Sequence, residues 1–299
     1  MRINPDGERL LVAYLRKMAE PDTVNRSVEK TGATALPFKS ILCAVDGSRG
    51  SGIALGQAIA LCGPGTTLRF VAVAHEVTYG GHAQVDLSEA KAREALDEAT
   101  RAAREAGVEA SAELLHGGFT ADLLLTEANG SDLLVIGCRN IPRRAGITLG
   151  DTASRLAHRA EGPLLVARGE AEDDFPRSVL LATDGSSASW PAARTAAKLA
   201  GARHAQLRVV YVPDGMHPEH YREVQKQVEL AEQATGAPPE LLADPGSVPA
   251  RIDEAARATR SSLIVIGKRG LRGVKALGSV SERVLHQAPS SVLVVPVGT

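Results

Sequence analysis

The sequence predicts an α/β protein built from two similar domains, each with a parallel β-sheet covered by helices. Short apolar runs alternate with Ala- and Leu-rich stretches of helical periodicity, which is the pattern of βαβ units. The order of landmarks also repeats, because "SILCAVDGS" at 40–48 returns as "SVLLATDGS" at 178–186, and "VIGCR" returns as "VIGKR". A chain of 299 residues with 44% hydrophobic and only 3% aromatic content is long enough for two domains with cores of Ala, Val, Leu and Ile.

The first repeat contains five predicted strands separated by helices. Its opening strand is a continuous apolar run, which is typical of a strand buried on both faces of a sheet. Its longest helix is strongly amphipathic and is followed by Gly107, a stop signal. The predicted strands are 41–46, 68–74, 109–115, 132–136 and 163–168, and the predicted helices are 51–62, 88–106, 120–128 and 151–160.

The second repeat follows the same order, with strands predicted at 179–183, 207–212, 239–243, 263–266 and 291–296. The repeats predict four parts of the chain: an N-terminal extension, a first domain, an acidic linker closed by a proline and a second domain, at 1–38, 39–168, 169–177 and 178–299. The extension matches neither repeat. Its residues 8–20 favour one amphipathic helix, and the rest is polar and expected to be loosely ordered.

Composition and charge argue against nucleic acids and membranes as partners. The formal net charge is −1, so no overall field attracts nucleic acid. No apolar run reaches the roughly 18 residues of a membrane helix, and charges interrupt the apolar stretch at the N-terminus that a signal peptide would need. The three cysteines, Cys43, Cys62 and Cys138, lack paired spacing, which is typical of a reduced protein. We therefore expect a cytoplasmic protein that binds neither nucleic acid nor membranes.

Topology predicts one ligand crevice in each repeat. Open parallel sheets bind ligands beyond the carboxyl ends of their strands, where the strand order reverses. With the order 3-2-1-4-5, the reversal lies between strands 1 and 4. The first strands end at Asp46 and Asp184, and the fourth strands end at Gly137 and Gly267. The most strongly repeated features would therefore meet at two equivalent crevices.

The segment after the fourth strand of the second repeat has the composition of a phosphate loop. It reads "GKRGLRGVKALGSVSERVLHQAPS", and its glycines allow a close approach of the backbone. Gly278 and Ser279 then open a helix, whose N-terminus is suited to an anion. Positive charge along the loop comes from Lys268, Arg269, Arg272 and Lys275. The alternative is that the glycines only shape a turn and Ser279 only caps a helix.

These motifs resemble those of the universal stress protein family. Its members share an Asp at the end of strand 1 and an ATP-binding signature, Gly-x2-Gly-x9-Gly-Ser/Thr, after strand 4. The resemblance covers 40–168 and 178–297, and the ending "GSVSERVLHQAPSSVLVVP" is especially close. It implies two flavodoxin-like domains of the Rossmann-like, HUP-type class. Each would be a five-stranded parallel sheet of order 3-2-1-4-5 with helices on both faces.

The resemblance implies that ATP, or the related ADP or AMP, binds chiefly in the second domain, with Mg²⁺ only as a companion of the nucleotide. Asp184 would contact the adenosine part and Val212 would lie against adenine. Ribose and phosphates would be held by Gly267, Gly270, Gly278, Ser279 and Ser281. Only seven residues separate Gly270 from Gly278, where the family signature has nine.

In the first domain the resemblance implies a degenerate site. The corresponding residues are Asp46, Val73, Gly137, Asn140 and Gly150. The spacing of the signature is intact, but Asn140 replaces a glycine and Asp151 replaces the Ser or Thr. A carboxylate at a helix N-terminus interacts with the N–H groups that a phosphate would use, and it repels phosphate. We therefore expect this site to bind ATP weakly or not at all.

The sequence predicts no catalytic residues and no metal site, although His217 and His220 are close in sequence. Cys138, beside Arg139, is a candidate accessible thiol at the first crevice. The function expected is that of a stress-response regulator whose bound nucleotide changes its engagement with an unidentified regulatory partner. The alternatives are a nucleotide-independent interaction or scaffold protein and, ranked last, a slow ATPase.

The fifth strand of each repeat is intensely apolar and would lie at a sheet edge. Exposed apolar edges invite pairing. We expect the two edges to cover each other in an intramolecular pseudo-dimer, a contact that the family resemblance also implies. Association of two chains into a homodimer is left open by the sequence.

Overall fold

The structure is a computed structural model that describes residues 35–74, 87–138, 141–143, 146–169, 174–213, 218–243, 245–268 and 277–297. The predictions for the helix at 8–20, for Asn140 and for Gly270 lie outside the described residues. None of the described helices is both long and apolar enough to span a bilayer.

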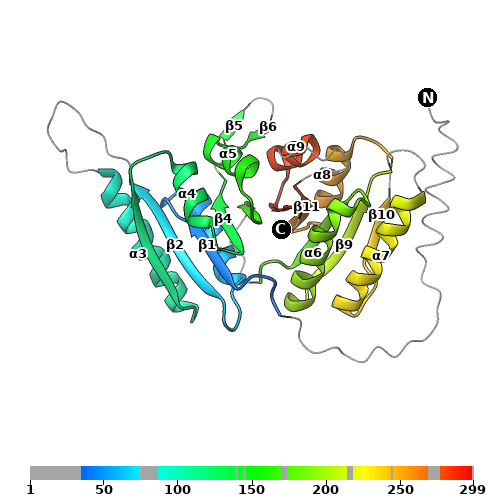
Figure 1. Cartoon of the computed structure of the whole chain (residues 1–299), viewed down its shortest axis with the longest axis horizontal. Coiled ribbons are helices and arrows are strands. Elements are labelled where there is room, and N and C mark those ends of the chain that lie inside the picture. Colours follow the sequence, from blue (N-terminus) through cyan, green and yellow to red (C-terminus); the bar gives the residue numbers. More distant parts are fainter. Residues whose placement is uncertain are drawn as a thin grey trace.

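Each repeat folds into five parallel strands joined through helices (Figure 1). The strands of the first repeat are β1 (Ser40–Ala44), β2 (Thr67–Ala74), β3 (Ala110–His116), β4 (Leu133–Gly137) and β7 (Leu164–Ala167). Those of the second are β8 (Ser178–Thr183), β9 (Gln206–Tyr211), β10 (Glu240–Ala243), β11 (Leu263–Gly267) and β12 (Ser291–Val295). The helices are α2 (Arg49–Ala60), α3 (Leu87–Glu105), α4 (Thr120–Ala128), α5 (Asp151–Arg159), α6 (Trp190–Arg203), α7 (Pro218–Thr235), α8 (Val248–Ala258) and α9 (Ser279–Gln287).

The ten strands form one continuous sheet in the order β10-β9-β8-β11-β12-β7-β4-β1-β2-β3. Each half therefore has the strand order 3-2-1-4-5, which confirms the predicted fold class. The two fifth strands, β7 and β12, pair antiparallel, with Leu165 opposite Leu293. The apolar edges expected to cover each other are thus joined by backbone hydrogen bonds, and both outer edges of the sheet are third strands.

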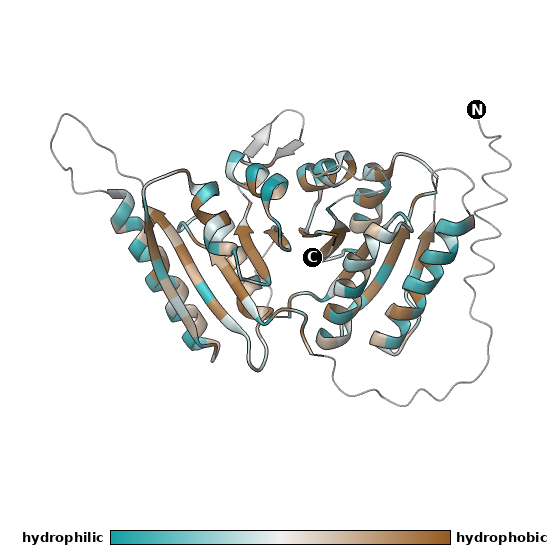
Figure 2. Cartoon of the chain, viewed as in Figure 1, coloured by the Kyte–Doolittle hydropathy of each residue, from teal (hydrophilic) through white to brown (hydrophobic). Residues whose placement is uncertain are grey.

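The sheet separates two hydrophobic cores, and each core runs through both halves. One core packs α2, α3, α6 and α7 against one face of the sheet, and the other packs α4, α5, α8 and α9 against the opposite face. Figure 2 shows the apolar strands inside and polar residues on the outer surfaces of the helices. This continuity follows from the β7–β12 pairing, which makes the two half-sheets one sheet.

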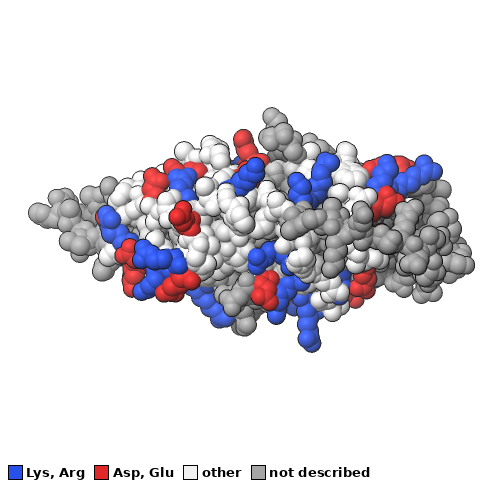
Figure 3. All heavy atoms as spheres, turned by 90° about the horizontal axis from the view of Figure 1, so that it is seen from below, with Lys and Arg blue, Asp and Glu red and all other residues white. Residues whose placement is uncertain are grey.

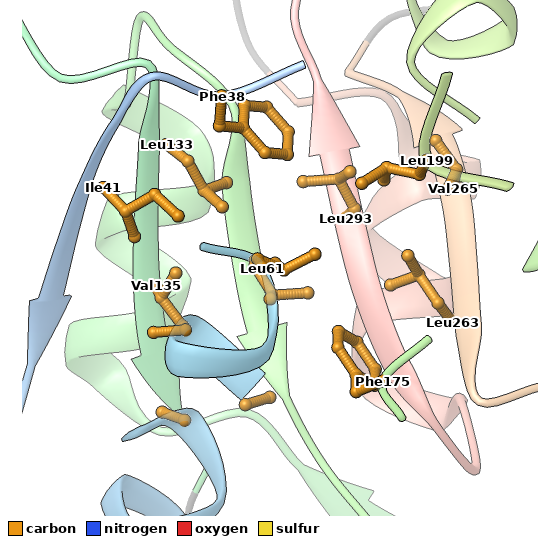
Figure 4. Packing of buried hydrophobic residues seen from close by; sticks show 14 of the residues in the cluster. Phe38, Ile41, Leu61, Leu133, Val135, Phe175, Leu199, Leu263, Val265 and Leu293 are labelled. Atoms are coloured by element: carbon orange, nitrogen blue, oxygen red, sulfur yellow. The ribbon is translucent and has the colours of Figure 1, made fainter. Parts of the chain in front are cut away.

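Two aromatic residues outside the repeats' strands and helices complete the first core. Phe38, next to β1, is 4% exposed, and Phe175 of the linker is 1% exposed. Figure 4 shows both rings beside Leu61, Leu293 and their neighbours, at the junction of the two halves. The linker, expected from its composition to be an acidic spacer, therefore also anchors the junction through Phe175.

One element was not expected from the sequence. The segment after β4 contains a two-stranded antiparallel hairpin, β5 (Ile141–Arg143) and β6 (Gly146–Thr148). These strands have only three residues each, β5 contains Pro142, and neither shows apolar alternation, so the sequence carries no strand signal here. This hairpin occupies the position of the first repeat's phosphate loop, and β6 packs against α9 of the other half.

Candidate nucleotide site

The crevice predicted for the second half would lie at the turn that follows β8. The Oδ1 atom of Asp184 accepts a hydrogen bond from the backbone N–H of Ser186 at 2.9 Å. Gly185 between them has φ +70°, a value that favours glycine. The turn therefore holds the half-buried carboxylate of Asp184 in place at the carboxyl end of the strand.

A buried polar network fixes this turn to α7. The hydroxyl of Thr183 donates to Oε1 of Gln227 at 2.7 Å and accepts from the backbone N–H of Gly185 at 3.1 Å. Nε2 of Gln227 donates to the hydroxyl of Ser189 at 3.0 Å. Ser186, only 7% exposed, has a buried hydroxyl that finds no partner among the described residues. No sequence motif predicts this network, because Gln227 lies on α7, 44 residues along the chain from Thr183.

Helix α7 sits directly on the same turn. A Cβ atom at Gly185 would lie 2.3 Å from the carbonyl oxygen of His220. In the first half, the equivalent Gly47 also has positive φ, but its nearest neighbour would be the Cβ of Ala95 at 3.8 Å. The helix after strand 2 is therefore packed more closely against this turn in the second half than in the first.

The fourth strand and the following helix meet at the base of the second-half loop. The hydroxyl of Ser281 donates to the carbonyl of Gly267 at 2.8 Å. The backbone N–H of Gly278 donates to the carbonyl of Lys268 at 3.0 Å. These two bonds close the loop at its root. Ser281, predicted as a ligand for ribose or phosphate, thus has a structural role that the sequence did not indicate.

The N-terminus of α9 lies at this closed root. Gly278 is the N-cap residue, with φ −69° and ψ 149°, and no side chain caps the helix. Ser279 is exposed at the first helical position. Because Ile266 pairs with Ala182, the ends of β11 and β8 are neighbours, and Asp184 lies two residues beyond Ala182. The structure thus brings Asp184, Gly267, Gly278 and the start of α9 to adjacent strand ends.

Val212 and Val73, predicted to lie against adenine, differ in environment. Val212 follows β9 and is 7% exposed, packed in the second core. Val73 belongs to β2 and is half-buried. Both stand near the carboxyl end of a second strand, as predicted.

The side chain of Lys268, expected to add positive charge to a phosphate loop, is buried instead. It is 5% exposed, and its Nζ donates to the carbonyl of Ala160, the C-cap residue of α5 in the first half. The ammonium group is therefore buried at the C-terminus of α5 and exposes little of its charge to solvent. Arg269, Arg272 and Lys275 lie outside the described residues.

The first-half crevice is arranged differently. Asp46 is exposed, and its Oδ1 accepts from the N–H of Ser48 at 2.9 Å. A Cβ atom at Gly137 would lie 2.3 Å from the carbonyl carbon of Gly50. The glycine that ends β4 is therefore required for the close packing of α2, whether or not a ligand binds.

The N-terminus of α5 lacks the hydroxyl found in α9. Gly150 is its N-cap residue, without a side-chain cap, and the exposed Asp151 is its first residue. Ala153 stands where α9 has Ser281, so the bond from helix to strand end is missing. The charge of Asp151 and the absent hydroxyl both distinguish this helix N-terminus from that of α9.

Comparison with known proteins agrees with this architecture. The sequence profile of the universal stress protein family matches residues 37–168 and 176–296. The chain belongs to the universal stress protein family. Its two matches lie in tandem, one in each half of the continuous sheet.

Individual relatives support the same assignment. A universal stress protein from Mycolicibacterium smegmatis is 31% identical over 194 residues, covering 58% of this chain and 65% of the relative. One from Thermus aquaticus is 37% identical over 134 residues, covering 40% of this chain and 98% of the relative. A crystal structure of a universal stress protein from Archaeoglobus fulgidus aligns with TM-score 0.72 and 20% identity over 87% of this chain and 99% of its own. At 20% identity, the similarity to the Archaeoglobus structure shows that the fold is shared.

In this universal stress protein Cys43 and Cys138 are buried and Cys62 is partly buried. Cys138, expected to be accessible at the first crevice, is 4% exposed, so that expectation is wrong. It is buried in the second core beneath α5. Burial raises the pKa of the Cys43 thiol far above its usual value and raises the pKa of Cys62 to about 11. A buried thiol with a raised pKa forms little of the reactive thiolate.

The described part of the chain has no metal-binding cluster, and the face drawn in Figure 3 carries charges of both signs. No three His, Cys, Asp or Glu side chains there are grouped so as to hold a metal ion. On the face drawn in Figure 3, basic and acidic side chains are interspersed among uncharged ones. His217 lies outside the described residues.

Proposed function

We propose that this universal stress protein is a stress-response regulator that binds an adenine nucleotide, ATP or its relatives ADP and AMP, in the crevice of its second half. The main support is the closed root of the loop between β11 and α9. There, Gly278 bonds to the Lys268 carbonyl and Ser281 bonds to the Gly267 carbonyl. This closure places an uncapped helix N-terminus beside the strand end that bears Asp184.

The chemistry of these groups suits a nucleotide. The first N–H groups of a helix lack intrahelical acceptors and carry partial positive charge, so they can donate to phosphate oxygens. The carboxylate of Asp184 can accept hydrogen bonds from hydroxyl or amino groups of adenosine, and Val212 offers an apolar surface for adenine. In this proposal the ribose and phosphates are held by Gly267, Gly270, Gly278, Ser279 and Ser281. Mg²⁺ would arrive with the nucleotide.

We propose a weak or absent site in the first half. Asp151 places a negative charge at the N-terminus of α5, and Ala153 cannot make the bond that Ser281 makes. Bound nucleotide in the second half would shift the protein between states that differ in affinity for a regulatory protein partner. A homodimer and the identity of that partner remain predictions.

The rival function is a nucleotide-independent interaction protein. It is favoured by the burial of Lys268 away from the crevice and by the shortened loop. Slow ATP hydrolysis is a third reading, for which the described residues offer no metal cluster to position phosphates.

Isothermal titration calorimetry with a matched pair of variants tests the proposal. Gly278→Asp and Gly150→Asp place the same carboxylate at equivalent N-cap positions of α9 and α5. Both backbones are extended there, with φ −69° and −68°, so aspartate fits and caps the helix. We expect wild type and Gly150→Asp to bind ATP, and Gly278→Asp to lose at least about tenfold in affinity through charge repulsion.

Each other outcome has a defined meaning. Absence of heat with wild type, and of nucleotide in extracts of the purified protein, would favour the nucleotide-independent reading. Loss of binding in Gly150→Asp alone would move the site to the first half. Phosphate release above that of a mock preparation would support the ATPase.

A further inference from the structure

The C-terminus of each of the helices α5 and α9 is capped by a cationic side chain from the opposite half of the molecule. Arg168, which follows β7 in the first half, donates from Nη1 to the Ala288 carbonyl of α9 at 3.0 Å and from Nη2 to the Leu285 carbonyl. Lys268, which follows β11 in the second half, donates to the Ala160 carbonyl of α5. The last carbonyls of a helix carry partial negative charge, so a cation from the opposite half stabilises each C-terminus.

The two caps come from non-equivalent positions. In the repeat, the counterpart of Lys268 is Cys138 and the counterpart of Arg168 is Pro296. Both cations are nearly buried, at 5% and 4% exposure. A buried charge is strongly destabilising unless its partners are kept, so these contacts constrain the relative positions of the helices.

Lys268 is also the root of the proposed phosphate loop. Its backbone N–H donates to the Val295 carbonyl of β12 at 2.7 Å, and its carbonyl accepts from Gly278 at 3.0 Å. One residue therefore connects the fifth strand, the N-cap of α9 and, through its side chain, the C-terminus of α5. A displacement of α5 would be transmitted to the start of α9.

Two contacts along α9 strengthen this connection. The backbone N–H of Leu149 in the first half donates to Nδ1 of His286 at 3.2 Å. Nε2 of His158 in α5 lies 3.6 Å from Oε1 of Glu282, in the first turn of α9. The hairpin strand β6 also packs against α9. The first half thus contacts α9 near its start, along its length and at its end.

We propose that Lys268 is a positioning residue, not a phosphate ligand, and that through it the first domain controls the nucleotide affinity of the second. This inference rests on the proposed function for its effect on nucleotide binding, but the anchoring itself can be tested without a nucleotide. The degenerate first domain then acts as a regulatory domain, because any partner that moves α5 changes the geometry of the α9 N-terminus.

Hydrogen exchange of the nucleotide-free protein tests the anchor. Lys268→Met should speed exchange of the amides at the start of α9 and the end of α5 by about tenfold or more. Lys198→Met, an exposed lysine on α6, removes the same charge and should leave exchange unchanged. Lys268→Arg keeps a cation at this position, so the same amides should exchange much more slowly in this variant than in Lys268→Met. Unchanged exchange in Lys268→Met, or equal acceleration in Lys268→Arg, would overturn the proposal.

Titration with ATP tests the consequence for the site. Lys268→Met and Arg168→Met should each weaken ATP binding by about tenfold, within the usual range of coupling between sites. Arg168 lies at the far end of α9 from Gly278, so its effect cannot come from touching phosphate. If Lys268→Met alone lost affinity while exchange stayed normal, Lys268 would be a direct ligand. If wild type bound no nucleotide, the proposed function would fail, and the exchange result would still decide the anchor.

Discussion

At the scale of single residues, equivalent positions in the two halves have acquired different surroundings. Gly185 and Gly47 both have φ near +70° in turns after a first strand. Only Gly185 faces a backbone carbonyl, that of His220, at a distance a side chain could not occupy. Glycine is therefore needed at position 47 for the geometry of the turn alone, and at position 185 for both the turn and the close packing of α7.

Replacing each glycine by alanine should separate these two effects. Gly47→Ala should lower the free energy of unfolding by about 1 kcal/mol, the cost of positive φ for a residue with a Cβ. Gly185→Ala should cost about 3 kcal/mol or more, because the clash adds an overpacking term. Urea unfolding of both variants measures the difference, and equal costs would contradict the close approach of α7.

At the scale of elements, one polar cluster joins α6 to α7 beside the second crevice. The indole N–H of Trp190 donates to Oε2 of Glu223 at 3.0 Å, and Nζ of Lys226 donates to Oε1 at 2.6 Å. Arg194 lies over the Trp190 ring, 5.6 Å from its centroid. The hydrogen bond from Lys226, followed by that from Trp190, lowers the pKa of Glu223.

This lowered pKa predicts an acid transition in fluorescence. A depressed carboxyl pKa means that the contact is kept above the ordinary value of 4.5 and is lost as the pH falls through the lower value. Trp190 is the only tryptophan of the chain, so the emission reports the surroundings of this one indole, which include Glu223. We expect a fluorescence midpoint below 4.5 in wild type and a higher midpoint in Lys226→Met. An identical midpoint in both would argue against the Lys226 bond.

At the scale of the whole molecule, a buried polar network lies beside the β7–β12 pairing. The hydroxyl of Ser291 lies 2.9 Å from Oε1 of Gln57 and 2.9 Å from the backbone nitrogen of Arg168. Nε2 of Gln57 donates to the Arg168 carbonyl at 3.2 Å. Ser291 and Gln57 are 0% and 1% exposed, so they are cut off from water. The network joins a helix of the first half to the last strand of the second.

Ser291→Ala should lower the free energy of unfolding by about 2 kcal/mol, because it leaves buried polar groups without a partner. Ser290→Ala is the matched control: its buried hydroxyl finds no partner among the described residues, so its loss should be neutral or stabilising. We also expect one unfolding transition for both halves, since their cores are continuous. Calorimetry and urea titration followed by two probes would show a second transition if the halves unfolded separately.

The repeated α/β architecture, the apolar character of the two fifth strands and the positions of Asp184, Gly267 and Gly278 could be predicted from the sequence. These features depend on local apolar periodicity and on glycine and cap signals, which act over a few residues. By contrast, the sequence did not predict that Ser281 joins α9 to β11, that Cys138 is buried or that Lys268 caps α5 of the opposite half. Those outcomes depend on contacts between residues far apart in the chain, where burial and a partner's carbonyl determine what a polar side chain does.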